Sequence, residues 1–178
     1  MIFTGEQSPI STMSSILPVS VWPSSVRPGT ITFVRHGQKN GGGFSADLTE
    51  QGRVDAEAAG RAMVCKADLF LASPSPRTVS TAECIRKGNG SGADIIVDEQ
   101  LAEPGLGLYT EFGPAMRAFL LSILNIVEGN KASVVIATTH NYVLDYVDAL
   151  TGSRDGMSGL LSGITLDLAF LKEIAEKL

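Results

Sequence analysis

The sequence predicts a three-layer α/β/α sandwich with a mostly parallel central sheet. From residue 30 onward, short runs of β-branched and aliphatic residues alternate with helical patterns, which is typical of strands joined by crossover helices. The run at 133–137 is apolar almost throughout, as in a strand buried on both faces. The chain has 178 residues, of which 44% are hydrophobic, so we expect one domain with a sizeable core.

Strands are expected where a short apolar run ends at turn-forming or charged residues. In chain order, the expected strands are 31–34, 68–72, 94–97, 133–137 and 164–168.

The expected helices fill the intervals between these strands. Thr49 is the expected N-cap of the first, whose apolar face would carry Val54, Ala58 and Ala62. The next would begin at Ser75-Pro76 and stop at the Gly-Asn-Gly-Ser-Gly run at 88–92. Later helices are expected at 114–127, 142–150 and 169–178.

Residues 1–29 differ in composition from the rest of the chain. They hold seven Ser and four of the eight Pro, and no Lys or Arg precedes Arg27. Pro18 interrupts the apolar residues that a secretory signal would need. We expect residues 1–29 to be an extension that is mobile or lies along the surface, and 30–178 to be the functional domain.

The charge and cysteine content argue against several classes of protein. With a net charge of −5, a broad nucleic-acid or membrane-surface footprint is not expected. No apolar run reaches the length of a membrane span. Cys65 and Cys84 match neither a disulfide framework nor a zinc site, so we expect two buried thiols in a reducing, cytoplasmic protein.

Both histidines of the chain directly follow predicted strands. His36 comes after 31–34 and Arg35, and His140 comes after 133–137 and two threonines. Because the carboxyl ends of strands in an open α/β sheet form the ligand-binding edge, the two imidazoles should meet there. Arg77 falls in the first turn of an expected helix, where backbone N–H groups also attract anions. Two Arg and two His predict a phosphoryl pocket, whereas each alone would suit an ordinary ion pair or structural role.

Five ordered motifs between residues 30 and 151 resemble those of the histidine phosphatase superfamily, which includes the cofactor-dependent phosphoglycerate mutases. The R-H-G signature is similar to Arg35-His36-Gly37, and the L-T-x-x-G motif to Leu48-Thr49-Glu50-Gln51-Gly52. The remaining pieces are Ser73-Pro74-Ser75-Pro76-Arg77 with Thr81-Ala82, Leu101-Ala102-Glu103, and Thr139-His140.

This resemblance implies a role for each matched residue. His36 would be the nucleophile that carries the phosphoryl group, and Arg35, Arg77 and His140 would hold its oxygens. Glu103 would be the general acid and base, with Glu99 as the reserve candidate. No metal or other cofactor is implied. The substrate would be a phosphorylated small molecule or a phosphoprotein, including phosphohistidine.

Departures from the family pattern leave two alternatives open. Pro104 follows Glu103, so the mutase-type loop is not seen, although a mutase or a phosphatase dedicated to one sugar phosphate remains an alternative. Pro104 and Asn141 also leave open a phosphate-binding interaction module without turnover. Little of the chain is available for a lid beyond 98–116 and 40–46, so an open pocket is expected.

Overall fold

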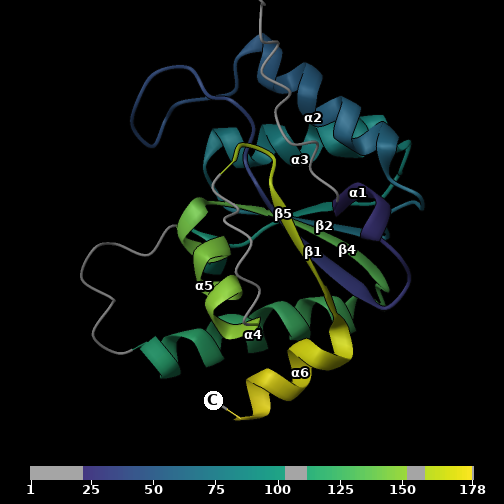
Figure 1. The fold of residues 1–178 in the computed structure, drawn as a ribbon, viewed down its shortest axis with the longest axis vertical. Coiled ribbons are helices and arrows are strands. Elements are labelled where there is room, and N and C mark those ends of the chain that lie inside the picture. The colour runs from purple at the N-terminus through teal and green to yellow at the C-terminus, as the bar shows by residue number, and fades with distance from the viewer. Residues whose placement is uncertain (1–21, 103–111, 152–158, 178) are drawn as a thin grey trace, which may run out of the picture.

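The computed structural model describes residues 22–102, 112–151 and 159–177, and these form a five-stranded sheet with helices on both faces (Figure 1). The sheet order is β3-β2-β4-β1-β5, in which β5 alone runs antiparallel to its neighbour. The expected α/β class and mostly parallel sheet are confirmed. The strands are β1 (Thr30–Arg35), β2 (Leu69–Ala72), β3 (Ile95–Val97), β4 (Val134–Thr139) and β5 (Gly163–Asp167).

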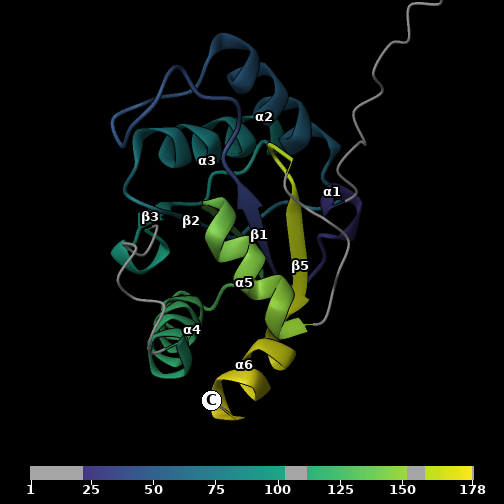
Figure 2. The ribbon, with the colours of Figure 1, turned by 60° about the vertical axis from the view of Figure 1, so that its left-hand side comes forward.

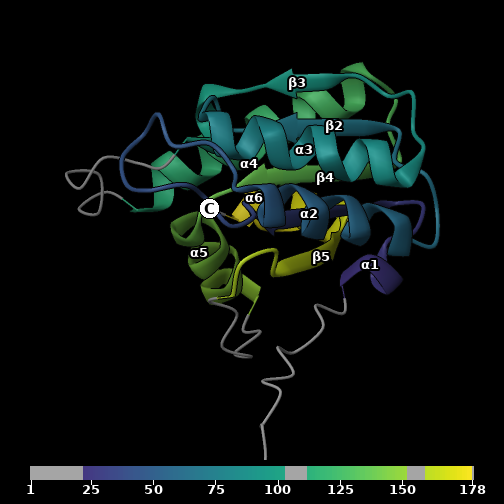
Figure 3. The same ribbon diagram turned by 90° about the horizontal axis from the view of Figure 1, so that it is seen from above.

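The helices form the two outer layers of the sandwich, one above and one below the sheet in Figure 1, and Figure 3 looks down on the upper of the two. One layer contains α1 (Trp22–Ser25), α2 (Glu50–Ala62) and α3 (Pro76–Asn89). The other contains α4 (Phe112–Gly129), α5 (Asn141–Thr151) and α6 (Leu168–Lys177). A short 3₁₀ helix, η1 (Glu99–Leu101), follows β3. Thr49 caps α2 by accepting a hydrogen bond from Gly52 N, and Gly90 ends α3 in the left-handed conformation.

Alternating strand side chains divide the hydrophobic core into two parts. On β1, Ile31 and Phe33 pack toward α4, α5 and α6, whereas Val34 packs toward the α1–α3 layer. The central strand β4 repeats this alternation and is buried at every position. A strand covered on both faces needs apolar residues at consecutive positions, which is the pattern that identified β4 in the sequence.

The pairing of β1 with β4 determines where the histidines lie. These parallel neighbours place Arg35 opposite Thr139 at the ends of the ladder, and His36 N donates to Thr139 O at 3.0 Å. His36 and His140 are the next residues of their strands, so both emerge side by side at one edge of the sheet. Figure 2 shows β1 with α5 in front of it and the antiparallel strand β5 beside it. A one-residue slip in register would separate them.

The buried face of α2 differs from the face expected from its apolar residues. Val54, Ala58 and Ala62 are exposed, and α2 instead buries Gly52, Ala56 and Gly60. The reason is the close approach of α3: a Cβ at Gly60 would lie 2.1 Å from Ile85 O. Only a glycine allows the two helix backbones to approach this closely. The contact face of α2 is therefore decided by the room between the helices and not by the hydropathy of its residues.

The packed domain begins before the expected boundary at residue 30. Trp22 is 2% exposed, Val26 is fully buried, and the Trp22 indole donates to Leu161 O at 2.8 Å. Gly163 allows this packing, since a Cβ there would meet the Trp22 ring at 2.7 Å. Burying the large Trp22 ring stabilises the fold more than leaving it exposed on a surface extension would. The rest of the expected extension, residues 1–21, lies outside the described residues.

Two further properties concern the chain as a whole. Within the described segments, no helix combines the length and apolar character needed to cross a bilayer. Cys65 and Cys84 are free thiols, each half-buried, and burial raises the pKa of both.

Candidate active site

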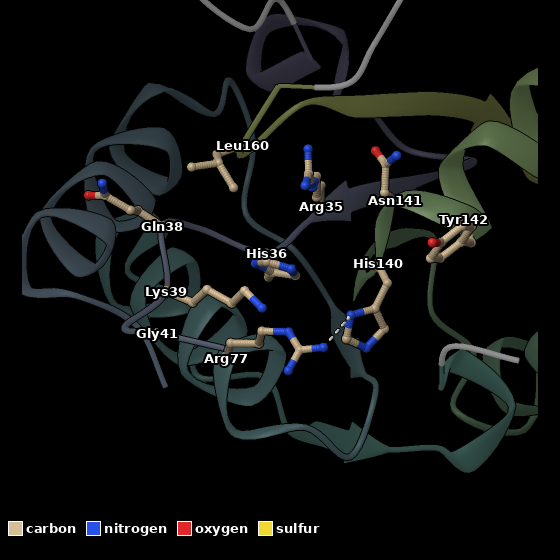
Figure 4. Close-up of a pocket in the computed structure, with 10 residues that line it drawn as sticks. All are labelled: Arg35, His36, Gln38, Lys39, Gly41, Arg77, His140, Asn141, Tyr142 and Leu160. Atoms are coloured by element: carbon tan, nitrogen blue, oxygen red, sulfur yellow. Dashed lines mark hydrogen bonds between the residues drawn. The ribbon is translucent and has the colours of Figure 1, made fainter. Parts of the chain in front are cut away.

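A pocket of about 440 Å³ opens at the sheet edge where β1 and β4 end (Figure 4). It brings together the four residues that the sequence assigned to phosphate, which come from the ends of β1 and β4 and from α3. Its described lining consists of Arg35, His36, Gln38, Lys39, Gly41, Arg77, His140, Asn141, Tyr142 and Leu160.

His36 is held in one tautomer by its own backbone. The residue is 6% exposed, and its Nδ1 lies 2.8 Å from Gly37 O. A carbonyl oxygen can only accept a hydrogen bond, so Nδ1 carries the proton and the neutral ring keeps its lone pair on Nε2. An imidazole fixed in this way presents an unprotonated nitrogen to the pocket that it lines.

His140 is fixed from two sides. Its Nδ1 lies 3.2 Å from Arg77 Nη2, and its Nε2 lies 2.8 Å from Ser73 Oγ. Because a guanidinium can only donate, Nδ1 accepts, and Nε2 of the neutral ring donates to the serine hydroxyl. The His36 and His140 rings stand edge to face with centroids 5.6 Å apart. Both imidazoles therefore border the same small space.

Arg77 is a buried cation that the glycine-rich loop holds in position. Its side chain begins in the first turn of α3, is 4% exposed as a residue, and donates from Nη1 to Gly43 O and Phe44 O at 3.2 and 3.3 Å. The Phe44 ring centroid lies 5.9 Å from the guanidinium carbon, within cation–π range. These contacts fix the guanidinium beside His140 before any ligand binds.

The electrostatics of the pocket favour anions and neutral imidazoles. Burial, together with the charges of Arg77, Arg35 and Lys39, lowers the pKa of His36 to about 4, although its bond to Gly37 opposes this shift. Burial and the neighbouring positive groups, Arg77 foremost, lower the pKa of His140 to about 3. At neutral pH both rings are uncharged, and a bound dianion would supply the counter-charge that raises both pKa values.

The carboxyl group expected to act as acid is not placed by the described residues. Glu103 lies outside them. Glu99, the reserve candidate, is an exposed residue of η1 and is not part of the pocket lining. Among the described residues, no group of three or more His, Cys, Asp and Glu could hold a metal ion.

Several residues near the pocket were not assigned a role from the sequence. Ser73 lies within a quoted motif, but its bond to His140 depends on the neighbouring ends of β2 and β4. Lys39 was given no role from the sequence, although it lines the pocket. Leu160 had no sequence signal, because it reaches the pocket from the turn that leads into the antiparallel strand β5. Tyr142 and Asn141 follow His140 at the start of α5.

The fold and pocket define an α/β protein in which two imidazoles and two guanidiniums line one pocket at the edge of the sheet. A family model described as histidine phosphatase superfamily (branch 1) matches residues 31–118. The chain belongs to the histidine phosphatase superfamily. A search by sequence among curated proteins found no significant match.

Solved structures with this fold share little sequence with the chain. SixA from Agrobacterium tumefaciens, assigned as a phosphohistidine phosphatase, is 18% identical, with a TM-score of 0.56 over 79% of this chain and 92% of that one. Phosphoserine phosphatase from Entamoeba histolytica, bound to 3-phosphoglyceric acid, is 16% identical, with a TM-score of 0.56 over 76% and 89%. A mycobacterial glucosyl-3-phosphoglycerate phosphatase is also 16% identical, with a TM-score of 0.57 over 78% and 90%. At these identities, the likeness concerns the fold.

Proposed function

We propose that this protein is a metal-independent phosphatase that hydrolyses phosphomonoesters through a phosphohistidine formed on His36. The observation that carries the proposal is the fixed tautomer of His36. Its Nδ1 proton is committed to Gly37 O, so the lone pair of Nε2 is available in a pocket that also holds Arg77 and His140. The substrate is a phosphorylated small molecule or a phosphoprotein, in a cytoplasmic setting.

In the first step, Nε2 of His36 attacks phosphorus and the bond from phosphorus to the ester oxygen breaks. The ester oxygen leaves with the bonding electrons and needs a proton, for which the sequence nominates Glu103. Arg35, Arg77 and His140 bind the three non-bridging oxygens, where negative charge is concentrated during transfer. His140 donates from Nδ1, which is protonated once the bound dianion has raised the pKa of the ring and which then exchanges its contact with Arg77 for the phosphoryl oxygen. Two guanidiniums in a mostly buried pocket can neutralise this charge without a metal ion.

In the second step, water attacks the phosphorus of phosphohistidine and the N–P bond breaks. Inorganic phosphate leaves, a water proton is released, and His36 regains its lone pair. The same cations hold the oxygens in both steps, so one set of side chains serves two displacements. Low pKa values suit this cycle, because the free His36 ring stays unprotonated well below neutral pH.

The test is phosphate release from p-nitrophenyl phosphate between pH 5 and 8, with and without a chelator. We expect activity that the chelator leaves unchanged, and loss of at least about a thousand-fold in His36→Ala. The Ser75→Ala variant, altered at a buried hydroxyl that bonds Thr78, serves as a folding control. If the phosphate of the substrate is radiolabelled, acid-labile label that stays on the wild-type chain after rapid quenching would identify the phosphohistidine intermediate. Full activity of His36→Ala would refute the mechanism.

A further inference from the structure

Leu160 is held at the pocket by a strained turn that leads into β5. It lines the pocket although its side chain is apolar and 46% exposed. The next residue, Leu161, has a φ of 57°, in the left-handed region that leucine rarely adopts. The turn is fixed from two sides, because the buried indole of Trp22 donates to Leu161 O at 2.8 Å and Arg35 N donates to Ser162 O at 2.9 Å. Backbone strain that the surrounding structure maintains is typical of functional sites, so the position of Leu160 calls for a function.

Two more exposed apolar side chains lie at this pocket. Tyr142, at the start of α5, also lines it and is 46% exposed. Phe44 is 66% exposed, and its ring centroid lies 5.9 Å from the guanidinium carbon of Arg77. Seven large hydrophobic side chains are exposed in the described part of the chain, and three of them are at this one place. Isolated exposed apolar residues are ordinary, but a group of them beside a pocket indicates a binding surface, and we call these three residues the apolar rim.

The charged and apolar parts of the pocket are separated in space. Figure 4 shows three cationic side chains grouped around His36, namely those of Arg35, Lys39 and Arg77. Leu160 and Tyr142 flank this group on opposite sides in the same view. In an in-line displacement the leaving oxygen stands opposite the attacking nitrogen, so the organic part of the substrate points away from His36. The cationic centre would then hold the phosphoryl group, and the exposed apolar rim lies where the organic part must pass.

We propose that the apolar rim binds the leaving group, and that the preferred substrates are phosphomonoesters of an alcohol with an aromatic or extended alkyl group. The proposal rests on the phosphatase activity proposed above. It makes Leu160 a specificity residue, which contacts the part of the substrate that leaves. Contact with an apolar leaving group removes apolar surface of both partners from water and therefore stabilises the complex. A sugar or polyol would instead lose hydrogen bonds to water against the same side chains.

The experiment compares 3-phenylpropyl phosphate with glycerol 3-phosphate. Both are phosphates of a primary alcohol on a three-carbon chain, which ends in a phenyl ring in the first and carries two hydroxyls in the second. We expect wild-type kcat/KM to be higher for 3-phenylpropyl phosphate. Leu160→Asn, which keeps the size but not the apolar character, should lower kcat/KM for 3-phenylpropyl phosphate about five- to thirty-fold more than for glycerol 3-phosphate. Leu160→Met should retain most of the preference, because methionine is apolar and of similar volume.

Val54→Asn is the matched control, because Val54 is 48% exposed on α2 and lies outside the described lining of the pocket. It should leave kcat/KM for both substrates unaffected. An equal loss on both substrates in Leu160→Asn would mean that Leu160 supports the pocket in general, and it would overturn the proposal. A wild-type preference for glycerol 3-phosphate, or a preference unchanged in Leu160→Asn, would overturn it as well.

Binding measurements separate this proposal from the activity on which it rests. The probes are 3-phenylpropylphosphonate and 3-hydroxypropylphosphonate, whose P–C bond a phosphatase does not hydrolyse. Calorimetry on the wild-type chain should show tighter binding and a more negative heat-capacity change for the phenyl compound, because more apolar surface is buried. A preference that disappears in Leu160→Asn supports the proposal even if no ester is hydrolysed. Equal affinities of the wild-type chain for the two phosphonates would overturn it even if the phosphatase activity is found.

Discussion

The backbone N–H of Gly37 donates to the hydroxyl of Thr81 at 3.0 Å, which ties the turn that follows His36 to the middle of α3. The same hydroxyl donates to Arg77 O at 2.6 Å. Thr81 is fully buried, so neither bond competes with water. One side chain thus links the segments that carry His36 and Arg77, which explains a threonine four residues after the arginine.

We therefore expect Thr81→Val to disturb both stability and activity. The substitution keeps the side-chain shape but leaves the buried Gly37 N–H without its acceptor, at a cost of about 1–3 kcal/mol. Urea unfolding should show this loss, and kcat/KM for p-nitrophenyl phosphate should fall. Thr81→Ser keeps the hydroxyl and should recover most of both. Wild-type behaviour of Thr81→Val would show that this link is dispensable.

Ser73→Ala should lower activity through the orientation of His140. The serine oxygen accepts the proton of Nε2, so its removal frees the ring to rotate away from Arg77. We expect kcat/KM to fall about ten-fold with little change in the thermal midpoint. Ser75→Ala is the matched control, since that hydroxyl bonds Thr78. Equal effects of the two substitutions would argue against a positioning role for Ser73.

Gly60→Ala should destabilise the fold even though alanine is the better helix former. The added Cβ would stand 2.1 Å from Ile85 O and 2.9 Å from Asn89 N, so α2 and α3 would have to separate. We expect a loss of at least about 1–3 kcal/mol in the free energy of unfolding. Gly129→Ala, at the end of α4 with nothing within 4 Å of the new atom, should be neutral or stabilising. A stable Gly60→Ala protein would contradict the close packing.

Stability should fall as the pH drops below about 6.5. An unfolded histidine takes up a proton near that value, whereas the folded pKa values are about 4 for His36 and about 3 for His140. The unfolded state therefore binds more protons than the folded state. As the pH falls from 6.5 to the folded pKa, each histidine lowers the free energy of unfolding by about 1.4 kcal/mol per pH unit. Between pH 6 and 5 few carboxyl groups titrate, and the chain has only these two histidines.

Thermal midpoints measured between pH 7.5 and 5 check this expectation. Saturating inorganic phosphate should weaken the pH dependence, because an anion beside the rings raises their folded pKa values. Phosphate binding near pH 6 should also take up protons, which calorimetry in buffers of different ionisation enthalpy measures. A midpoint that stays constant from pH 7 to 5 would contradict the neutral, buried state of both rings.

The order of strands and helices could be predicted from the sequence because each element depends on a pattern of residues that are adjacent in the chain. The continuous apolar run of β4 and the cap at Thr49 each depend on a few neighbouring residues. The R-H-G motif and the second histidine identified the pocket for the same reason, since each directly follows a strand. A strand end is a local feature, and parallel pairing then brings such ends together.

The sequence by itself determined the fold class, the family and the four residues Arg35, His36, Arg77 and His140 that meet at the pocket. Only the tertiary structure decided the face on which α2 packs, the burial of Trp22, the bond from His140 to Ser73 and the direction of Lys39. Hydropathy periodicity registers how apolar a helix face is, and glycines such as Gly52 and Gly60 contribute little to that measure. Contacts between segments far apart in the chain depend on distances that no local pattern encodes.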